Sequence, residues 1–112
     1  KNLYKIGYSS GPVKDRIKNA ASDPTYLMAA VKLVMEYDAY NVNPQKFEAL
    51  LHRFFAAACL NVDVFDSDGT RYTPREWFVV PINVIETAVE LLINGEIVNY
   101  AYDAQNKDIV SL

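Results

Sequence analysis

Apolar residues change their spacing several times along this chain, and these changes constrain the fold more than any single motif. Residues 3–8 and 29–37 carry the β-branched and aromatic side chains and the loose alternation of strands. Residues 44–58 place apolar side chains at the spacing of one helix face, as do residues 82–93. With a further strand at 77–80, the order of elements predicts a small α/β or α+β domain.

Turn and cap residues set the limits of these elements. Asn43 and Pro44 fit the start of a helix, as cap and first-turn residue, and Asn94-Gly95 fits the end of the helix at 82–93. A shorter helix is expected at residues 13–21, ending before Pro24. Residues 62–65 and 70–73, with the turn between them, predict a short hairpin or an ordered loop, and residues 97–102 a final strand.

Length and composition place the chain in a broad class. Its 112 residues are enough for one domain with one core, and we treat residues 95–112 as a C-terminal extension of it. No apolar run approaches the length of a membrane span, so no membrane association is expected. The single cysteine, Cys59, cannot form an internal disulfide, which favours a reduced, cytoplasmic (intracellular) compartment.

Charge is unevenly distributed, although the net charge is only −3. Residues 1–53 contain eight Lys and Arg against five Asp and Glu, whereas residues 54–112 contain three against nine. A basic half beside an acidic half is typical of a module with one anion-binding face. Chance scatter of surface charge explains the same numbers about equally well.

A carboxylate and an imidazole stand four residues apart in the expected helix at 44–58. Glu48 and His52 therefore project from the same side of that helix. Mg²⁺ (or Mn²⁺) often binds to one or two carboxylates together with waters and a substrate phosphate, so Glu48 is the candidate metal ligand. The alternative is structural: a solvated Glu–His pair, or a histidine tucked under the sheet.

Other candidates lie near the first strand and before the last. Arg16 is suited to binding a phosphate and stabilising the charge of a phosphoryl transition state. Taken alone, it is better explained as a surface arginine in the charged run around it. Tyr4 and Tyr8 are able to align a water or to hydrogen-bond a phosphate, although strand tyrosines are more often packing residues. Lys5 is a further candidate for shaping the same site, and Glu76 is either an edge charge or another residue that shapes the site.

Taken together, these motifs resemble the GIY-YIG nuclease superfamily, and within it the phage and meiotically up-regulated type. The residues that carry the resemblance are Tyr4-Lys5-Ile6-Gly7, Arg16, Glu48 with His52 and Phe55, and Glu76-Trp77-Phe78. The resemblance covers about residues 3–80. It implies an α+β fold, a small α/β sandwich in which helices flank a central mixed three-stranded sheet, and it implies a metal-dependent DNA endonuclease. It implies that Tyr4 lies near the attacking water, that Arg16 stabilises the phosphoryl charge and that Glu48 holds Mg²⁺. His52 would transfer a proton or contact the phosphate, and no organic cofactor is implied.

The first motif of that superfamily, Gly-Ile-Tyr on a preceding strand, is absent. The resemblance therefore implies that the chain is truncated at its N-terminus and that activity is weakened or lost. A sheet without its first strand has an unpaired edge, through which two copies could form a homodimer.

Two functions and one structural role remain open from the sequence. The first is a DNA endonuclease domain, in which Tyr4, Arg16, Glu48 and His52 are the catalytic residues. The second is a non-catalytic module on the same scaffold that binds nucleic acid or another protein, which the low positive charge and the absent motif favour. The third is an unrelated α/β dimerisation element, which requires the candidate residues to be scattered.

Overall fold

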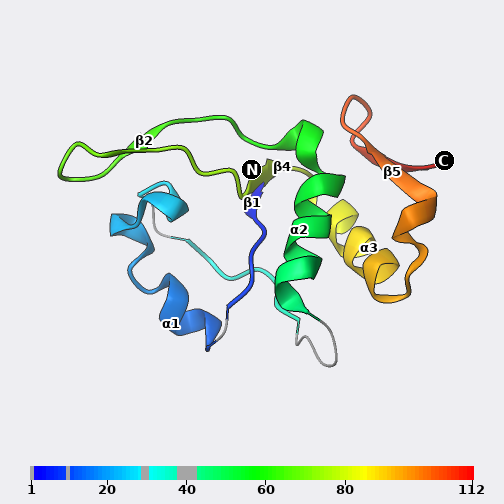
Figure 1. The fold of residues 1–112 in the computed structure, drawn as a ribbon, viewed down its shortest axis with the longest axis horizontal. Coiled ribbons are helices and arrows are strands. Elements are labelled where there is room, and N and C mark those ends of the chain that lie inside the picture. Colours follow the sequence, from blue (N-terminus) through cyan, green and yellow to red (C-terminus); the bar gives the residue numbers. More distant parts are fainter. Residues whose placement is uncertain (1, 10, 29–30, 38–42) are drawn as a thin grey trace.

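The computed structural model describes residues 2–9, 11–28, 31–37 and 43–112. Its helices and strands confirm the α+β class expected from the sequence. The strands β1 (Leu3–Lys5) and β4 (Trp77–Val79) lie side by side in the middle of the molecule (Figure 1). The helix α1 (Val13–Ile17) lies to one side of them, and α2 (Pro44–Phe54) and α3 (Ile82–Ile93) lie to the other.

The central strand pair is antiparallel and continues beyond its last paired residue. Leu3 is opposite Val79 and Lys5 is opposite Trp77. After β1 ends, the Ile6 amide still donates to the carbonyl oxygen of Glu76, at 3.0 Å. The residues that follow β1, which we call segment 6–8, are thereby held beside the start of β4.

The predicted central three-stranded sheet is wrong for the described residues, which form three separate two-stranded antiparallel sheets. The second edge of β4 meets only a short stretch of chain: Cys59 bridges Phe78, and the Leu60 amide donates to Trp77. The remaining strands form hairpins. They are β2 (Val64–Phe65) with β3 (Arg71–Tyr72), which is the first of the two alternatives predicted there, and β5 (Tyr100–Asp103) with β6 (Asp108–Ser111).

The strand predicted at 29–37 explains this error. Ala29 and Ala30 lie outside the described residues, and residues 31–37 form no strand. Their burial nevertheless alternates as in a strand, because positions 31, 33 and 35 are half-buried while 32, 34 and 36 are exposed. Alternation selects a face for each side chain, but a strand also needs a neighbour for its backbone hydrogen bonds. Within the described residues, segment 31–37 has no such neighbour.

The main core lies between α2, α3 and one face of the strand pair. Phe55, Phe78 and Val80 are at most 1% exposed, and Phe55 meets Tyr102 edge-on at 5.0 Å between ring centroids. A second, smaller cluster lies on the opposite face, where Trp77 packs with Ala20 and Tyr26. Because successive strand residues point to opposite faces, neighbours on β4 enter different clusters.

Both long helices begin where the sequence indicates, and α3 also ends there, whereas α2 ends at Phe54 and the end of the expected 44–58 helix forms a 3₁₀ turn at Ala56–Ala58. The Asn43 side chain accepts hydrogen bonds from the amides of Gln45 and Lys46 at the start of α2. Gly95, at φ 80°, follows the end of α3. The first helix is shorter than predicted: α1 covers Val13–Ile17, has no buried residue, and is followed by a 3₁₀ turn at Ala20–Ser22. No helix in the described ranges is long and apolar enough to cross a membrane.

The C-terminal residues add to the core. In place of one strand at 97–102, the chain forms a 3₁₀ helix at Glu96–Asn99 and the β5–β6 hairpin. Ile97, Tyr102 and Ile109 pack against the main cluster beside α3. This hairpin lies at the end of the molecule opposite α1 (Figure 1).

Candidate functional site

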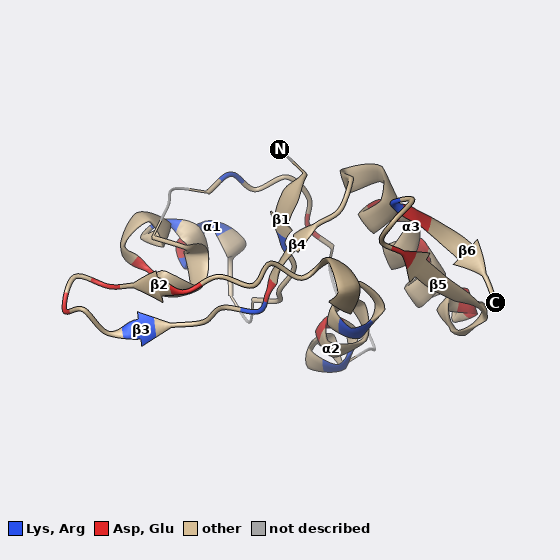
Figure 2. Ribbon diagram, turned by 90° about the horizontal axis from the view of Figure 1, so that it is seen from above, with Lys and Arg blue, Asp and Glu red and all other residues tan. Residues whose placement is uncertain are grey.

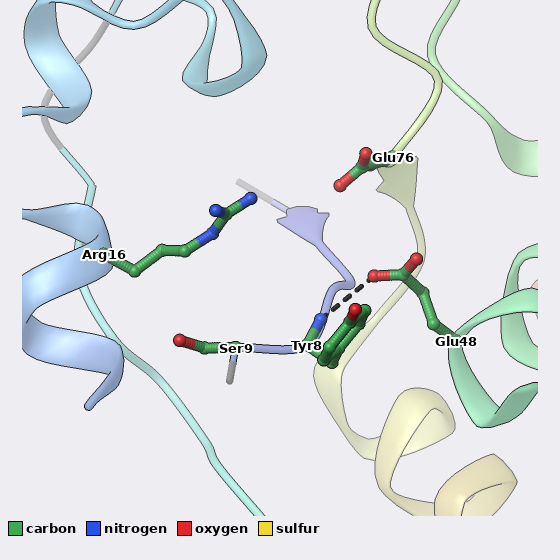
Figure 3. A pocket seen from close by; sticks show the side chains of 5 residues that line it. All are labelled: Tyr8, Ser9, Arg16, Glu48 and Glu76. Atoms are coloured by element: carbon green, nitrogen blue, oxygen red, sulfur yellow. Dashed lines mark hydrogen bonds between the residues drawn. The ribbon is translucent and has the colours of Figure 1, made fainter. Parts of the chain in front are cut away.

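A polar pocket of about 290 Å³ opens where three distant parts of the chain meet (Figure 3). Arg16 reaches it from α1, Glu48 from α2 and Glu76 from the residue before β4, and Tyr8 and Ser9 complete its lining. Figure 3 shows the two carboxylates turned toward the same space, with the Arg16 side chain extending toward it from the opposite side. The sequence separation of these residues means that only the folded chain forms the pocket.

The helix α2 holds segment 6–8 through one polar stripe. Gln45, Glu48 and His52 are spaced i, i+3 and i+7, so they share a helix face. The Tyr8 amide donates to Glu48 Oε2 at 3.0 Å, and Gln45 Nε2 donates to the Tyr8 hydroxyl at 2.6 Å. His52 Nε2 lies 2.6 Å from the Ile6 carbonyl oxygen. Because the Tyr8 oxygen accepts from Gln45, its own hydrogen is available to a ligand in the pocket.

Glu76 is held by a largely buried lysine. Lys5 Nζ lies 2.7 Å from Glu76 Oε1, and the Lys5 side chain is only 11% exposed. The same ammonium lies 4.8 Å from the centre of the Tyr26 ring, a favourable cation–π distance. This ion pair fixes one wall of the pocket and compensates the charge of one of its two carboxylates.

Gly7 lies where these charged groups come closest. A Cβ atom on Gly7 would stand 3.0 Å from Lys5 Nζ, 3.3 Å from Glu48 Oε2 and 3.5 Å from Glu76 Oε1. Three charged groups from three elements therefore surround one position that has no side chain. A glycine there allows the backbone to approach both carboxylates closely.

Arg16 is the cation of the pocket that remains available to an anion. It is exposed, and no ion pair or side-chain hydrogen bond of its guanidinium is found within the part of the chain that the structure describes. Arginine presents several donors in a planar fork and matches phosphate geometry. The pocket thus combines an unpaired cation with two carboxylates and a hydroxyl.

The donor set fits a hard divalent cation bound by few protein ligands. The described residues contain no group of three His, Cys, Asp or Glu side chains that could hold a metal by themselves. Mg²⁺ does not need such a group, because it usually keeps several waters and binds one or two carboxylates plus substrate phosphate. Glu48 accepts one hydrogen bond from Tyr8 and retains further lone pairs for a metal.

The structure brings some of the predicted site residues together and leaves others apart. Arg16 and Glu48 face one pocket, together with Tyr8 and Glu76, while Lys5 supports Glu76 from behind. Tyr4 is not among the lining residues: it is half-buried against the main core. The alternation of β1 sends Tyr4 to the core face, whereas the chain leaves the ladder after Lys5 and frees Tyr8 for the pocket.

His52 also lies outside the pocket lining, bound to Ile6. Two contributors were not foreseen from the sequence, Ser9 and Gln45. Ser9 gave no signal, because the sequence Ser9-Ser10-Gly11-Pro12 is typical of a turn. Gln45 could have been found, because it shares the helical face of Glu48 and His52.

The sequence profile of the T5orf172 domain matches residues 1–93. The chain belongs to the T5orf172 domain family. A relative in Bacillus subtilis (strain 168), named "Uncharacterized protein YeeC", is 39% identical over 93 residues. That match covers 83% of this chain but 24% of YeeC, so the chain spans about a quarter of its relative's length. No solved structure matches the chain.

The T5orf172 match corrects the resemblance drawn from the motifs. The assignment to the GIY-YIG superfamily is wrong, because the family that matches is the T5orf172 domain and no GIY-YIG family does. The motifs were short, and two of their residues have structural roles here: Tyr4 packs in the core and His52 binds a backbone carbonyl. Domains of the T5orf172 family are in general nuclease-like or DNA-binding, so an association with nucleic acid is retained.

Proposed function

We propose that this T5orf172 domain is a metal-dependent endonuclease domain that cleaves phosphodiester bonds in DNA. The observation that carries the proposal is the convergence of Arg16 and Glu48 on one polar pocket. A phosphodiester needs a cation beside its non-bridging oxygens and a means of stabilising the charge that develops during cleavage. Arg16 would supply the cation beside these oxygens, and its exposed position is open to a large ligand.

Each side chain of the pocket has a distinct task under this proposal. Arg16 binds the phosphate and compensates its growing negative charge. The Tyr8 hydroxyl, whose oxygen accepts from Gln45, donates its hydrogen to a phosphate oxygen or to a water. Glu48, oriented by the Tyr8 amide, directs its remaining lone pairs to a metal. Glu76, paired with Lys5, keeps the wall of the pocket in place.

The cofactor of the proposal is Mg²⁺, or Mn²⁺ in its place. Glu48 would hold it, with Glu76 as the nearest second carboxylate. When bound, the ion would stabilise negative charge on the phosphate and on the leaving oxygen. Because Mg²⁺ keeps several of its waters when bound, it can bind in an open pocket that supplies few protein ligands.

The distribution of charge suits contact with DNA on one side of the molecule. Lys and Arg residues lie on α1, α2 and β3, whereas α3 carries only acidic residues among its charged side chains (Figure 2). The pocket opens between α1 and α2, on the more basic side. The acidic end around α3 would be turned away from the polyanion.

The test is the variant Glu48→Gln, which keeps the size of the side chain and removes its charge. We expect Mg²⁺-dependent nicking of a supercoiled plasmid by the full chain to fall at least a hundredfold, in line with the loss of about 2.7 kcal/mol or more that removal of one electrostatic group causes. Glu90→Gln, on the exposed surface of α3, is the matched control and should cleave normally. Unchanged nicking by Glu48→Gln would refute the enzymatic proposal.

The second candidate is a non-catalytic module that binds nucleic acid or another protein. Two observations favour it: Tyr4 and His52 lie outside the pocket, and the net charge is −3. Calorimetry distinguishes the two candidates, because only the enzyme requires Mg²⁺ uptake that depends on Glu48. DNA binding that weakens with salt, without such uptake and without nicking, would establish the module.

A further inference from the structure

The His52 ring makes two contacts, and neither faces the pocket. Its Nε2 atom lies 2.6 Å from the Ile6 carbonyl oxygen. Its ring packs against the buried Phe78, with centroids 5.1 Å apart and planes tilted by 42°. Because a carbonyl oxygen can only accept, Nε2 must carry a hydrogen and donate it. This nitrogen is therefore committed to the backbone of segment 6–8.

The spacing of α2 matches the spacing of the segment that it binds. Four helical residues rise about 6 Å along the axis, and the Ile6 carbonyl and the Tyr8 amide lie on either side of the single residue Gly7. Glu48 and His52 can therefore bind the Tyr8 amide and the Ile6 carbonyl at the same time. The earlier helix residue binds the later backbone group, so segment 6–8 runs antiparallel to α2.

Segment 6–8 is also held from the side of β4. The Ile6 amide donates to the Glu76 carbonyl oxygen, while the Ile6 carbonyl accepts from His52. Ile6 thus joins two parts of the pocket. Its amide binds the backbone of Glu76, and its carbonyl binds α2, the helix that carries Glu48. Loss of the His52 contact would leave Ile6 bound on one side only, and would loosen Tyr8 relative to Glu48.

We infer that His52 is a positioning residue: it fixes the Ile6 carbonyl and thereby sets the placement of Tyr8 and Glu48, and it does not transfer a proton. The consequence for DNA cleavage rests on the proposed function, but the holding of segment 6–8 does not. His52 acts through the backbone, so another side chain that donates a hydrogen bond from the same place should replace it.

Two substitutions separate holding from proton transfer. His52→Gln places a side-chain amide N–H near the position of Nε2 but cannot exchange protons near neutral pH, whereas His52→Ala removes the donor. Glu90→Gln, at an exposed position of α3 on the side turned away from the proposed DNA contact, is the control. Each full-length variant is measured by hydrogen exchange of the Tyr8 amide, by Mg²⁺ affinity in calorimetry and by plasmid nicking.

We expect the Tyr8 amide to exchange about tenfold faster in His52→Ala, as befits the loss of about one hydrogen bond's contribution. Its Mg²⁺ affinity and nicking should fall together. In His52→Gln all three should return to within about threefold of the unmodified chain, while loss of a general acid or base would cost about 10²- to 10⁴-fold in rate. Glu90→Gln should behave as the unmodified chain.

Two results would overturn the inference. A His52→Gln variant with a protected Tyr8 amide but nicking as low as in His52→Ala would assign proton transfer to His52. A His52→Ala variant with unchanged Tyr8 exchange would show that the ring does not hold the segment. If His52→Ala does not fold, the Tyr8 amide exchange and the nicking rate of His52→Gln decide between holding and proton transfer. If the unmodified chain nicks no DNA, the proposed function fails, whereas the exchange data still test the holding.

Discussion

Gly7→Ala is the substitution that tests the pocket most directly, because it adds a methyl group among the charged side chains and removes none of them. The new Cβ would stand 3.0 Å from Lys5 Nζ and 3.3 Å from Glu48 Oε2. Both distances are tighter than those of most Cβ contacts, so the neighbours must move by a few tenths of an ångström. Glu48 cannot move freely, because the Tyr8 amide holds the same oxygen.

The expected effects on stability and on activity have different origins. A displacement of about 1 Å in a catalytic group costs about a hundredfold in rate, so a few tenths of an ångström should lower nicking about tenfold. Gly7 is not one of the positive-φ glycines, so alanine is compatible with its backbone. Alanine also restricts the unfolded chain, which stabilises by about 0.4–1 kcal/mol and offsets some of the strain. We therefore expect a loss of activity and Mg²⁺ affinity with little change in stability.

The chain offers a matched control in Gly11→Ala. A Cβ on Gly11 would meet no atom of the described residues within 4 Å, apart from Gly11 itself and its chain neighbours. The φ angle of Gly11 is not positive either. This variant should gain the same small stabilisation and keep full nicking activity. Both variants are compared by urea denaturation, by Mg²⁺ calorimetry and by plasmid nicking. If Gly7→Ala and Gly11→Ala were indistinguishable in all three, the packing of the pocket around Gly7 would be refuted.

Two further variants probe the C-terminal hairpin. The Tyr102 hydroxyl is buried without a hydrogen-bond partner among the described residues, so Tyr102→Phe should raise the free energy of unfolding by about 1 kcal/mol in denaturant titration; a loss of stability would contradict this. Hydrogen bonds from the Asn106 side chain and backbone lower the pKa of Asp103 below its usual 3.8. A carboxylate whose pKa is lower in the folded state stabilises the fold at pH values above its unfolded-state pKa. This stabilisation is lost as pH falls through the folded-state pKa. The free energy of unfolding of Asp103→Asn should therefore fall less steeply than that of the unmodified chain as pH drops below about 4. If both fall with the same slope, the effect is excluded.

Local sequence was sufficient to place the long helices. Pro44 after a capping Asn43 started α2, and an apolar stripe between Pro81 and Gly95 gave the bounds of α3. Such elements are set by interactions within a few residues, namely capping, periodicity and the φ freedom of glycine. The hairpin at 62–73 was found for the same reason.

The sheet was predicted less well because strand pairing is not local. Residues 31–37 alternate in burial as a strand should, yet lack a partner among the described residues. The site showed the same limit. The helical spacing of Glu48 and His52 was correctly read as one face, but which side chain meets the pocket and which meets the backbone depended on where segment 6–8 lies.

The sequence by itself determined the α+β class, the start of α2, the extent of α3 and the residue types available for phosphate chemistry, because periodicity, caps and side-chain chemistry are local properties. Only the tertiary structure decided that Tyr8 rather than Tyr4 lines the pocket, that Lys5 pairs with Glu76, and that His52 binds Ile6. Those contacts join residues tens of positions apart. They follow from how the chain leaves β1 between α2 and β4, and no short-range pattern encodes that path.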